Sequence, residues 1–161
     1  MKRKKTVTLL LSLLIVITLN TNLVPQEQPD KLLIKVFCNR VVDGDTISVL
    51  TDDKRELRIR YIGIDTPETK RKDVFGTRSI AKKATEFNKK LVEGKKVYLE
   101  YDYETNDRYK RELCYVWLDE NRTKMAQYEL LRVGLAVVKT YYPNLKYYRE
   151  YLTYSLEAEN H

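Results

Sequence analysis

The chain has 161 residues, enough for one domain, and 43% of them are hydrophobic, enough for a packed core. Its formal net charge of +7 falls to +3 from position 27 onward, where 26 basic residues face 23 acidic ones. This mildly basic remainder permits a polyanionic partner without requiring one. The only histidine is His161, which excludes a histidine base and a zinc cluster and leaves acid–base chemistry to carboxylates, arginine, lysine or tyrosine.

The N-terminal segment has the pattern of an export signal. A basic start at residues 2–5 precedes an apolar run at 7–19, which is short for a membrane-spanning helix. No clear small-x-small cleavage site follows this run. We therefore expect residues 1–26 to be a signal peptide and linker, with an uncleaved anchor as the alternative, and residues 27–161 to form one folded domain.

Hydrophobic periodicity and turn residues divide the rest of the chain into short elements. The sequence predicts strands at 32–42, 46–50 and 56–64, a helix at 77–93, strands at 95–103 and 111–118, a helix at 123–133, an extended segment at 136–142 and a helix at 145–159. Five strands with a helix between the third and fourth is the order of an OB-type barrel. The predicted fold is α+β, mainly β: a five-stranded OB-fold barrel with three helices.

Helix boundaries and buried faces follow from local signals. Thr123 is the expected N-cap of the second helix, and Gly94 and Gly134 are the expected ends of the first two. The expected core stripes, at three- and four-residue intervals, are Ile80, Ala84, Phe87 and Leu91 in the first helix and Leu145, Tyr148, Leu152 and Leu156 in the third.

Two cysteines, Cys38 and Cys114, lie in apolar strand patterns. We expect both to be free, buried thiols that pack as small hydrophobes. A single disulfide is the alternative in an exported protein.

Two acidic turns flank a strand that carries arginines. Asp45 follows the first strand, and Asp65 and Glu68 follow the third, so the three carboxylates can converge if the strands pair. Carboxylate oxygens beside arginines suit a hard cation next to a phosphate. Asp, Gly and Thr are also ordinary turn formers, so two solvated turns are the alternative. The side chain of Arg60 is expected on the face of the strand opposite to that of Ile59, and it needs an anionic partner if it is buried.

The sequence contains, in order, VVDGDT at 41–46, RIRYIGIDTPET at 58–69 and DRYKR at 107–111. Together these segments resemble the signature of the staphylococcal nuclease (thermonuclease) family. The resemblance covers about residues 32–160, nearly the whole chain after the leader.

The resemblance implies a calcium site. Its ligands would be Asp45, Asp65 and the backbone carbonyl of Thr66, with waters completing the shell. Asp43 would be a further carboxylate beside the metal.

The resemblance also implies catalytic and substrate-binding residues. Glu68 would act as the general base or orient the attacking water, and Arg60 and Arg111 would be the catalytic arginines. The implied substrate contacts are Arg108 and Tyr109 at a terminal phosphate and Tyr141 at a nucleoside. Family enzymes cut DNA and RNA and leave 3′-phosphate ends.

Three residues depart from the family pattern. Lys110 stands where the family often has glycine, and lysine adopts a left-handed backbone less readily. If the loop needs that conformation, Arg111 could be displaced, and Glu112 could compete for its guanidinium. Lys139 stands in place of a second substrate-side tyrosine.

The leading functional prediction is a secreted, monomeric, calcium-dependent nuclease that cleaves DNA and RNA. One alternative is an OB-fold nucleic-acid-binding module that has lost hydrolysis. Another is a membrane-anchored surface protein whose acidic turns hold structural calcium.

Overall fold

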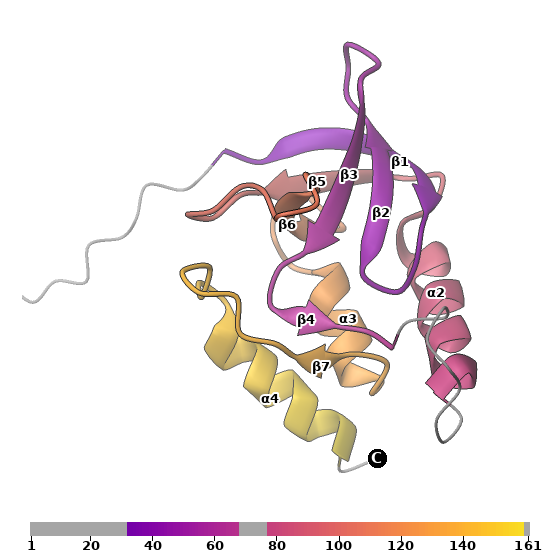
Figure 1. Cartoon of the computed structure of the whole chain (residues 1–161), viewed down its shortest axis with the longest axis vertical. Helices are drawn as coiled ribbons and strands as arrows, with labels where there is room; N and C mark the ends of the chain where they lie inside the picture. Colours follow the sequence, from indigo (N-terminus) through magenta and orange to yellow (C-terminus); the bar gives the residue numbers. More distant parts are fainter. Residues whose placement is uncertain (1–31, 68–76, 160–161) are drawn as a thin grey trace, which may run out of the picture. The chain divides into compact units, whose positions relative to one another are not determined.

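The computed structural model describes residues 32–67 and 77–159. The expected signal peptide and Glu68 therefore lie outside the described residues. The described chain is built on a closed barrel of five strands in the order β1–β2–β3–β6–β5 (Figure 1). The barrel strands are β1 (Ile34–Val41), β2 (Thr46–Leu50), β3 (Glu56–Tyr61), β5 (Lys96–Glu100) and β6 (Glu112–Trp117).

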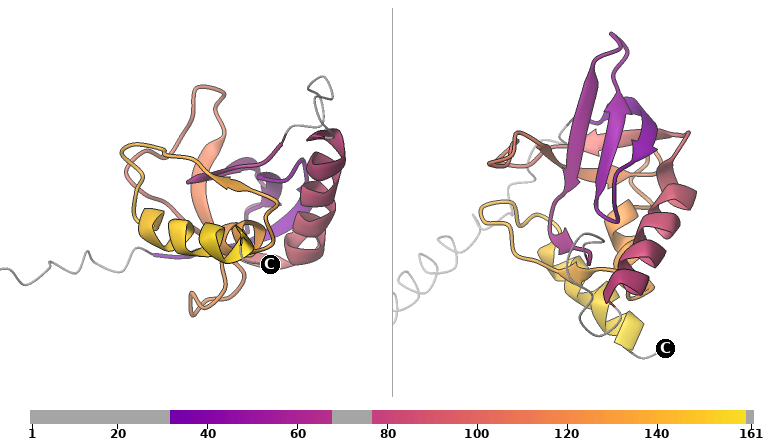
Figure 2. Two further views of the ribbon diagram at one scale, coloured as in Figure 1. Left: turned by 90° about the horizontal axis from the view of Figure 1, so that it is seen from below. Right: turned by 45° about the vertical axis from the view of Figure 1, so that its right-hand side comes forward.

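Three helices accompany the barrel among the described residues: α2 (Thr77–Val92), α3 (Ala126–Arg132) and α4 (Tyr148–Glu159). Helix α2 lies between the third and fourth barrel strands in the chain, so the predicted α+β OB-fold barrel is confirmed. Figure 2 shows α2 along one side of the barrel and α4 beside β7 on another. No helix in the described ranges is long and apolar enough to cross a membrane.

The strand registers bring distant parts of the sequence together. Strands β2 and β3 are antiparallel and pair Thr46 with Arg60. Strands β3 and β6 are parallel and pair Ile59 with Glu112, so the start of β6 lies beside the end of β3. The residue just before β6, Arg111, is thereby brought close to the Thr46 end of the hairpin.

The predicted strand at 56–64 is two strands, because Gly63 turns the chain at a φ of +81°. After this turn, β4 (Ile64–Asp65) leaves the barrel and pairs with β7 (Val137–Val138) in a small antiparallel sheet. A side chain at Gly63 would collide with the ring of Tyr151, whose nearest atom lies 2.2 Å from the position of a Cβ. Only glycine satisfies both the backbone angle and the close approach.

The predicted apolar stripes of two helices are partly wrong. Ala84 is buried, and Phe87 and Leu91 pack against the core as predicted, but Ile80 is 40% exposed. The buried face of α2 also includes Ala81, Asn88 and Val92. On α4 and the turn before it, Leu145, Leu152 and Leu156 are all exposed, and the buried residue is Tyr151.

The predicted N-cap of α3 is also wrong. Met125 occupies the N-cap without a side-chain hydrogen bond. The Thr123 hydroxyl donates instead to Asp119 at 2.9 Å, which holds the preceding turn.

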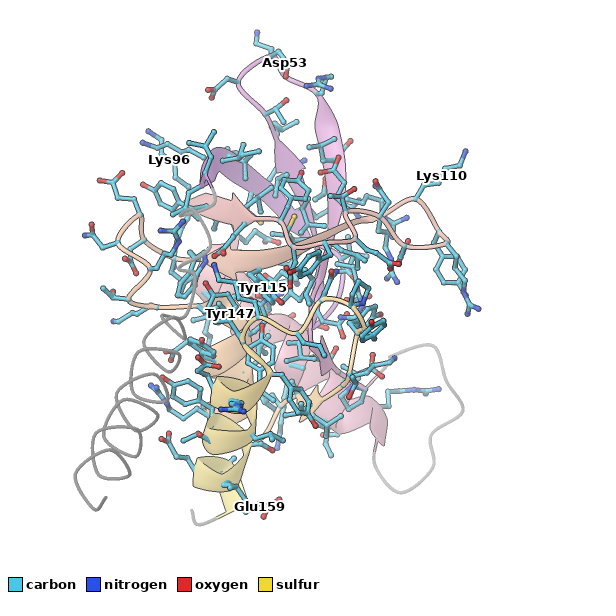
Figure 3. The ribbon with its side chains drawn as sticks, turned by 90° about the vertical axis from the view of Figure 1, so that its left-hand side faces the viewer. Asp53, Lys96, Lys110, Tyr115, Tyr147 and Glu159 are labelled. Carbon is cyan, nitrogen blue, oxygen red and sulfur yellow. The ribbon has the colours of Figure 1, made fainter. Side chains whose placement is uncertain are left out.

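Aromatic rings join α4 and the segment before it to the barrel. Tyr115 on β6 and Tyr147 meet edge to face with ring centroids 4.7 Å apart (Figure 3). The Tyr151 hydroxyl donates to the Ile62 carbonyl at 3.1 Å. Edge-to-face pairs of this kind stabilise beyond the area they bury.

Both cysteines are free and buried, as expected. Burial raises the pKa of the Cys38 thiol to about 11 and that of Cys114 well above its ordinary value. Each therefore stays protonated at neutral pH and packs as a small apolar side chain.

Candidate active site

A pocket of about 670 Å³ opens where three chain segments meet: the turns around β2 to β4, the β5–β6 loop and the segment after β7. Nine of the residues singled out from the sequence line this pocket: Asp43, Asp45, Arg60, Asp65, Thr66, Arg108, Tyr109, Arg111 and Tyr141. The tenth, Glu68, lies outside the described residues. The convergence expected from strand pairing is therefore present for Asp45 and Asp65, the two of the three carboxylates that the structure describes.

Arg60 is the buried cation at the base of the pocket. It is 3% exposed, and its guanidinium lies 3.1 Å from Asp45 Oδ2 and 2.6 Å from Asp65 Oδ1. It also donates to the Tyr61 carbonyl at 3.0 Å. The expected anionic partner is thus two carboxylates, one from each acidic turn.

Asp45 is buried beside other negative charges. Its Oδ2 accepts hydrogen bonds from the Thr66 backbone N–H at 2.7 Å and the Thr66 hydroxyl at 3.1 Å. Burial, with the nearby carboxylates of Asp43 and Asp65, raises the pKa of Asp45 to about 6 against the attraction of Arg60. A cation bound among these carboxylates would favour the ionised form.

The side-chain groups of Asp43, Asp45 and Asp65 that could bind a metal in this part of the pocket are carboxylate oxygens. Hard cations such as Ca²⁺ and Mg²⁺ prefer carboxylate and carbonyl oxygens, with water completing the shell. Within residues 32–67 and 77–159, no group of three or more His, Cys, Asp and Glu side chains is arranged to hold a metal. The carboxylate oxygens of Asp45 and Asp65 are nevertheless of the chemical kind that a hard cation prefers.

Arg111 enters the pocket from the other side. Its Nε donates to Asp107 Oδ2 at 2.7 Å, and its Nη1 lies 3.3 Å from the Thr46 hydroxyl. Lys110 does take the left-handed conformation, with a φ of +62°, so lysine here does not displace Arg111 from the pocket. Glu112 accepts a hydrogen bond from the Tyr101 hydroxyl.

Asp107 is a pocket residue that the sequence reading did not single out. Its carboxylate accepts from the backbone N–H groups of Tyr109 and Arg111 as well as from the Arg111 side chain. Burial raises the pKa of Asp107, but these hydrogen bonds and the charge of Arg111 outweigh it, so the net shift is downward. The sequence did contain a signal for this role. Asp107 begins a turn segment, and Asp side chains in turns accept hydrogen bonds from the backbone N–H two residues later, here that of Tyr109.

The family model described as "Staphylococcal nuclease homologue" matches residues 58–161. The chain belongs to the staphylococcal nuclease family. Thermonuclease from Staphylococcus hyicus is 44% identical over 108 residues, which cover 67% of this chain and 61% of that protein. Endonuclease YncB from Bacillus subtilis (strain 168) is 37% identical over 138 residues, which cover 84% of this chain and 63% of that protein. The chain thus spans less than two thirds of the length of these relatives.

Two tyrosines of this staphylococcal nuclease homologue lie against cationic groups at the pocket rim. Tyr109 is 64% exposed, and the guanidinium carbons of Arg108 and Arg111 lie 4.8 and 5.5 Å from its ring centroid. The Tyr141 ring lies 5.9 Å from the Arg60 guanidinium carbon and 5.8 Å from Lys139 Nζ. Arginine over an aromatic face keeps the ring and the charge together at one position.

Lys139 also reaches the carboxylates. Its Nζ lies 3.2 Å from Asp65 Oδ2, whereas Arg60 lies 2.6 Å from the other oxygen, Oδ1. In this family member, the lysine that the sequence marks as a departure therefore contacts one of the expected metal ligands.

Proposed function

We propose that the chain is a calcium-dependent nuclease that hydrolyses phosphodiester bonds of DNA and RNA to 3′-phosphate products. The observation that carries the proposal is the meeting of Arg60 and Arg111 in one pocket with Asp45 and Asp65. Phosphoryl chemistry needs positive charge at the phosphate oxygens and a positioned water. The arginines of this pocket would supply the first, and a cation held by its carboxylates would hold the second.

Each residue has a proposed role in this reaction. Asp45, Asp65 and the Thr66 carbonyl would hold Ca²⁺, which would supply charge stabilisation to the phosphate and a site for the attacking water. The two arginine forks of Arg60 and Arg111 would bind the phosphate oxygens, with Arg111 also favouring departure of the leaving oxygen. Glu68 would accept a proton from the attacking water or orient it.

The rim residues would hold the substrate on either side of the scissile bond. Arg108 and Tyr109 would contact a terminal phosphate, and Tyr141 would pack on a nucleoside. Stacking and phosphate contact recognise features that DNA and RNA share, which supports a nuclease that does not select the sugar. We further propose that the protein is secreted through the segment at residues 1–26 and acts as a monomer.

The binding-module alternative depended on displacement of Arg111 by the Lys110 loop. Because Arg111 lines the pocket and pairs with Asp107, we favour the enzyme. The alternative remains a defined outcome of the experiment below.

The experiment incubates the full chain with single-stranded DNA and with RNA, each in calcium, in magnesium and in chelator. We expect cleavage in calcium that chelator abolishes. A folded chain that binds DNA without cleaving it would overturn the proposal in favour of the binding module. Calcium-dependent melting without nucleic-acid binding would favour structural calcium.

Two variants test the assigned roles. Glu68→Ala and Arg111→Lys should each retain the fold and lose most turnover, since the first removes the proposed base and the second the bidentate fork. Arg132→Lys, an exposed arginine on α3, is the matched control and should cleave as the wild type does. Unchanged turnover in either test variant would remove that residue from the mechanism.

A further inference from the structure

Both carboxylate oxygens of Asp65 contact cationic side chains. Oδ1 lies 2.6 Å from Arg60 Nη2, and Oδ2 lies 3.2 Å from Lys139 Nζ. A divalent cation that used Asp65 as a ligand would therefore meet an oxygen that already carries a positive partner.

The backbone register positions Lys139 for this contact. In the β4–β7 sheet Asp65 pairs with Val137, and the Lys139 N–H donates to the Gly63 carbonyl at 2.9 Å, which extends the same ladder. Side chains alternate between the faces of a strand, so Lys139 lies on the same face as Asp65, one diagonal position away. A long side chain spans that diagonal, so the contact follows from the pairing of the two strands.

The two cations differ in how easily they can leave. Arg60 is 4% exposed in its side chain, is bonded to Tyr61 and is paired with Asp45 as well. The Lys139 side chain is 47% exposed, so its ammonium group can return to water at little cost. Lys139 is therefore the partner of Asp65 that an incoming cation can displace.

We propose that Lys139 is a tethered cation that occupies Asp65 in the metal-free protein and lowers the affinity of the site for a divalent metal ion. This inference rests on the proposed calcium-dependent function and concerns the same site. Lys139 acts through Asp65 and is thus a positioning residue. It neutralises part of the carboxylate cluster until metal takes its place, so the site fills only when calcium is abundant enough to displace it.

The test is calorimetric titration of the full chain with calcium alone, without nucleic acid. Lys139→Met removes the charge and keeps the length of the side chain. Its calcium affinity should rise by about threefold to tenfold, as expected when a half-exposed cation is removed beside a doubly charged ion. Lys139→Arg should bind calcium as the wild type does, and Lys139→Gln should behave as Lys139→Met does.

Lys96→Met is the matched control, because Lys96 is an exposed lysine on β5 (Figure 3). It lines a separate pocket. Its calcium affinity should stay at the wild-type value. Thermal melting should repeat the pattern, with a larger calcium-induced rise in Tm for Lys139→Met than for either the wild type or Lys96→Met.

Unchanged or weaker calcium binding by Lys139→Met would overturn the inference and leave the proposed nuclease intact if the wild type binds calcium and cleaves. An equal gain in Lys96→Met would also overturn it, because the effect would then be one of net charge. Absence of calcium binding in every variant would overturn both this inference and the calcium dependence of the proposed function.

Discussion

The carboxylate of Asp107 holds Arg111 at two points, accepting from its backbone N–H at 3.0 Å and from its Nε at 2.7 Å. The same carboxylate accepts from the Tyr109 backbone. Asp107 thus stabilises the turn through the two backbone N–H groups and also orients the Arg111 guanidinium, which lines the pocket.

Asp107→Asn should lower kcat more than it raises KM. The amide oxygen can keep the backbone bonds of the turn, but the amide NH2 would face the Arg111 Nε–H, so the charge-assisted bond is lost. This loss costs about 1 kcal/mol or more and lowers kcat about fivefold to tenfold. Steady-state cleavage of single-stranded DNA measures this. Asp119→Asn is the control, because Asp119 holds a similar turn through the backbone of Asn121 and Thr123 on a different loop. An equal loss in both variants would mean that Asp107 matters for stability alone.

Lys110→Gly should stabilise the protein slightly and leave turnover within about twofold of the wild type. Lys110 has a φ of +62°, which strains an L-residue, and glycine removes that strain at some entropic cost. The expected gain in unfolding free energy is about 0.5 kcal/mol by urea denaturation. Lys54→Gly, at a φ of +61°, should give the same gain. A large rise in turnover for Lys110→Gly alone would show that the lysine misplaces Arg111.

Asp45 makes the metal-free protein less stable as pH rises. Its folded pKa of about 6 exceeds the ordinary 3.8, so the folded state binds the proton more tightly than the unfolded state does. The contribution to stability is complete below pH 3.8 and is lost as pH rises through about 6.

Asp45→Asn should therefore be more stable than the wild type in chelator at pH 7, by about 1–3 kcal/mol, and equal to it near pH 4. Urea denaturation across this range measures the difference. Asp119→Asn should show the opposite sign, because hydrogen bonds from Thr123 and Lys124 outweigh burial and lower the pKa of Asp119. Calcium affinity of the wild type should fall below pH 6 as Asp45 takes up a proton. Lower stability of Asp45→Asn at pH 7 would contradict the inference that burial and the charges of Asp43 and Asp65 destabilise the ionised Asp45.

Gly63→Ala should be strongly destabilising, because a Cβ would lie 2.2 Å from the Tyr151 ring at a φ of +81°. Overpacking and backbone strain together cost about 3 kcal/mol or more. Gly94→Ala is the matched control: it has a φ of +73° and nothing within 4 Å of the new Cβ, so it should cost about 1 kcal/mol. Equal losses in urea denaturation would show that α4 yields to admit the methyl group.

The sequence by itself determined the barrel and most of the pocket. The alternation of apolar and polar residues, together with turn-forming residues, predicted five strands and the intervening helix. The five strands pair into a closed barrel. The acidic turns follow paired strands, so Asp45, Arg60 and Asp65 had to meet once the strands paired. Local signals sufficed because the period of a strand and the position of a turn are properties of short segments.

Only the tertiary structure decided what depends on contacts between distant segments. The exposed face of α4 follows from the insertion of Tyr151 beside Gly63, which turns Leu152 and Leu156 toward solvent. The contact between Lys139 and Asp65 follows from the pairing of two-residue strands more than 70 positions apart. Periodicity in one segment carries no information about which partner it meets, so these features arise from packing and register alone.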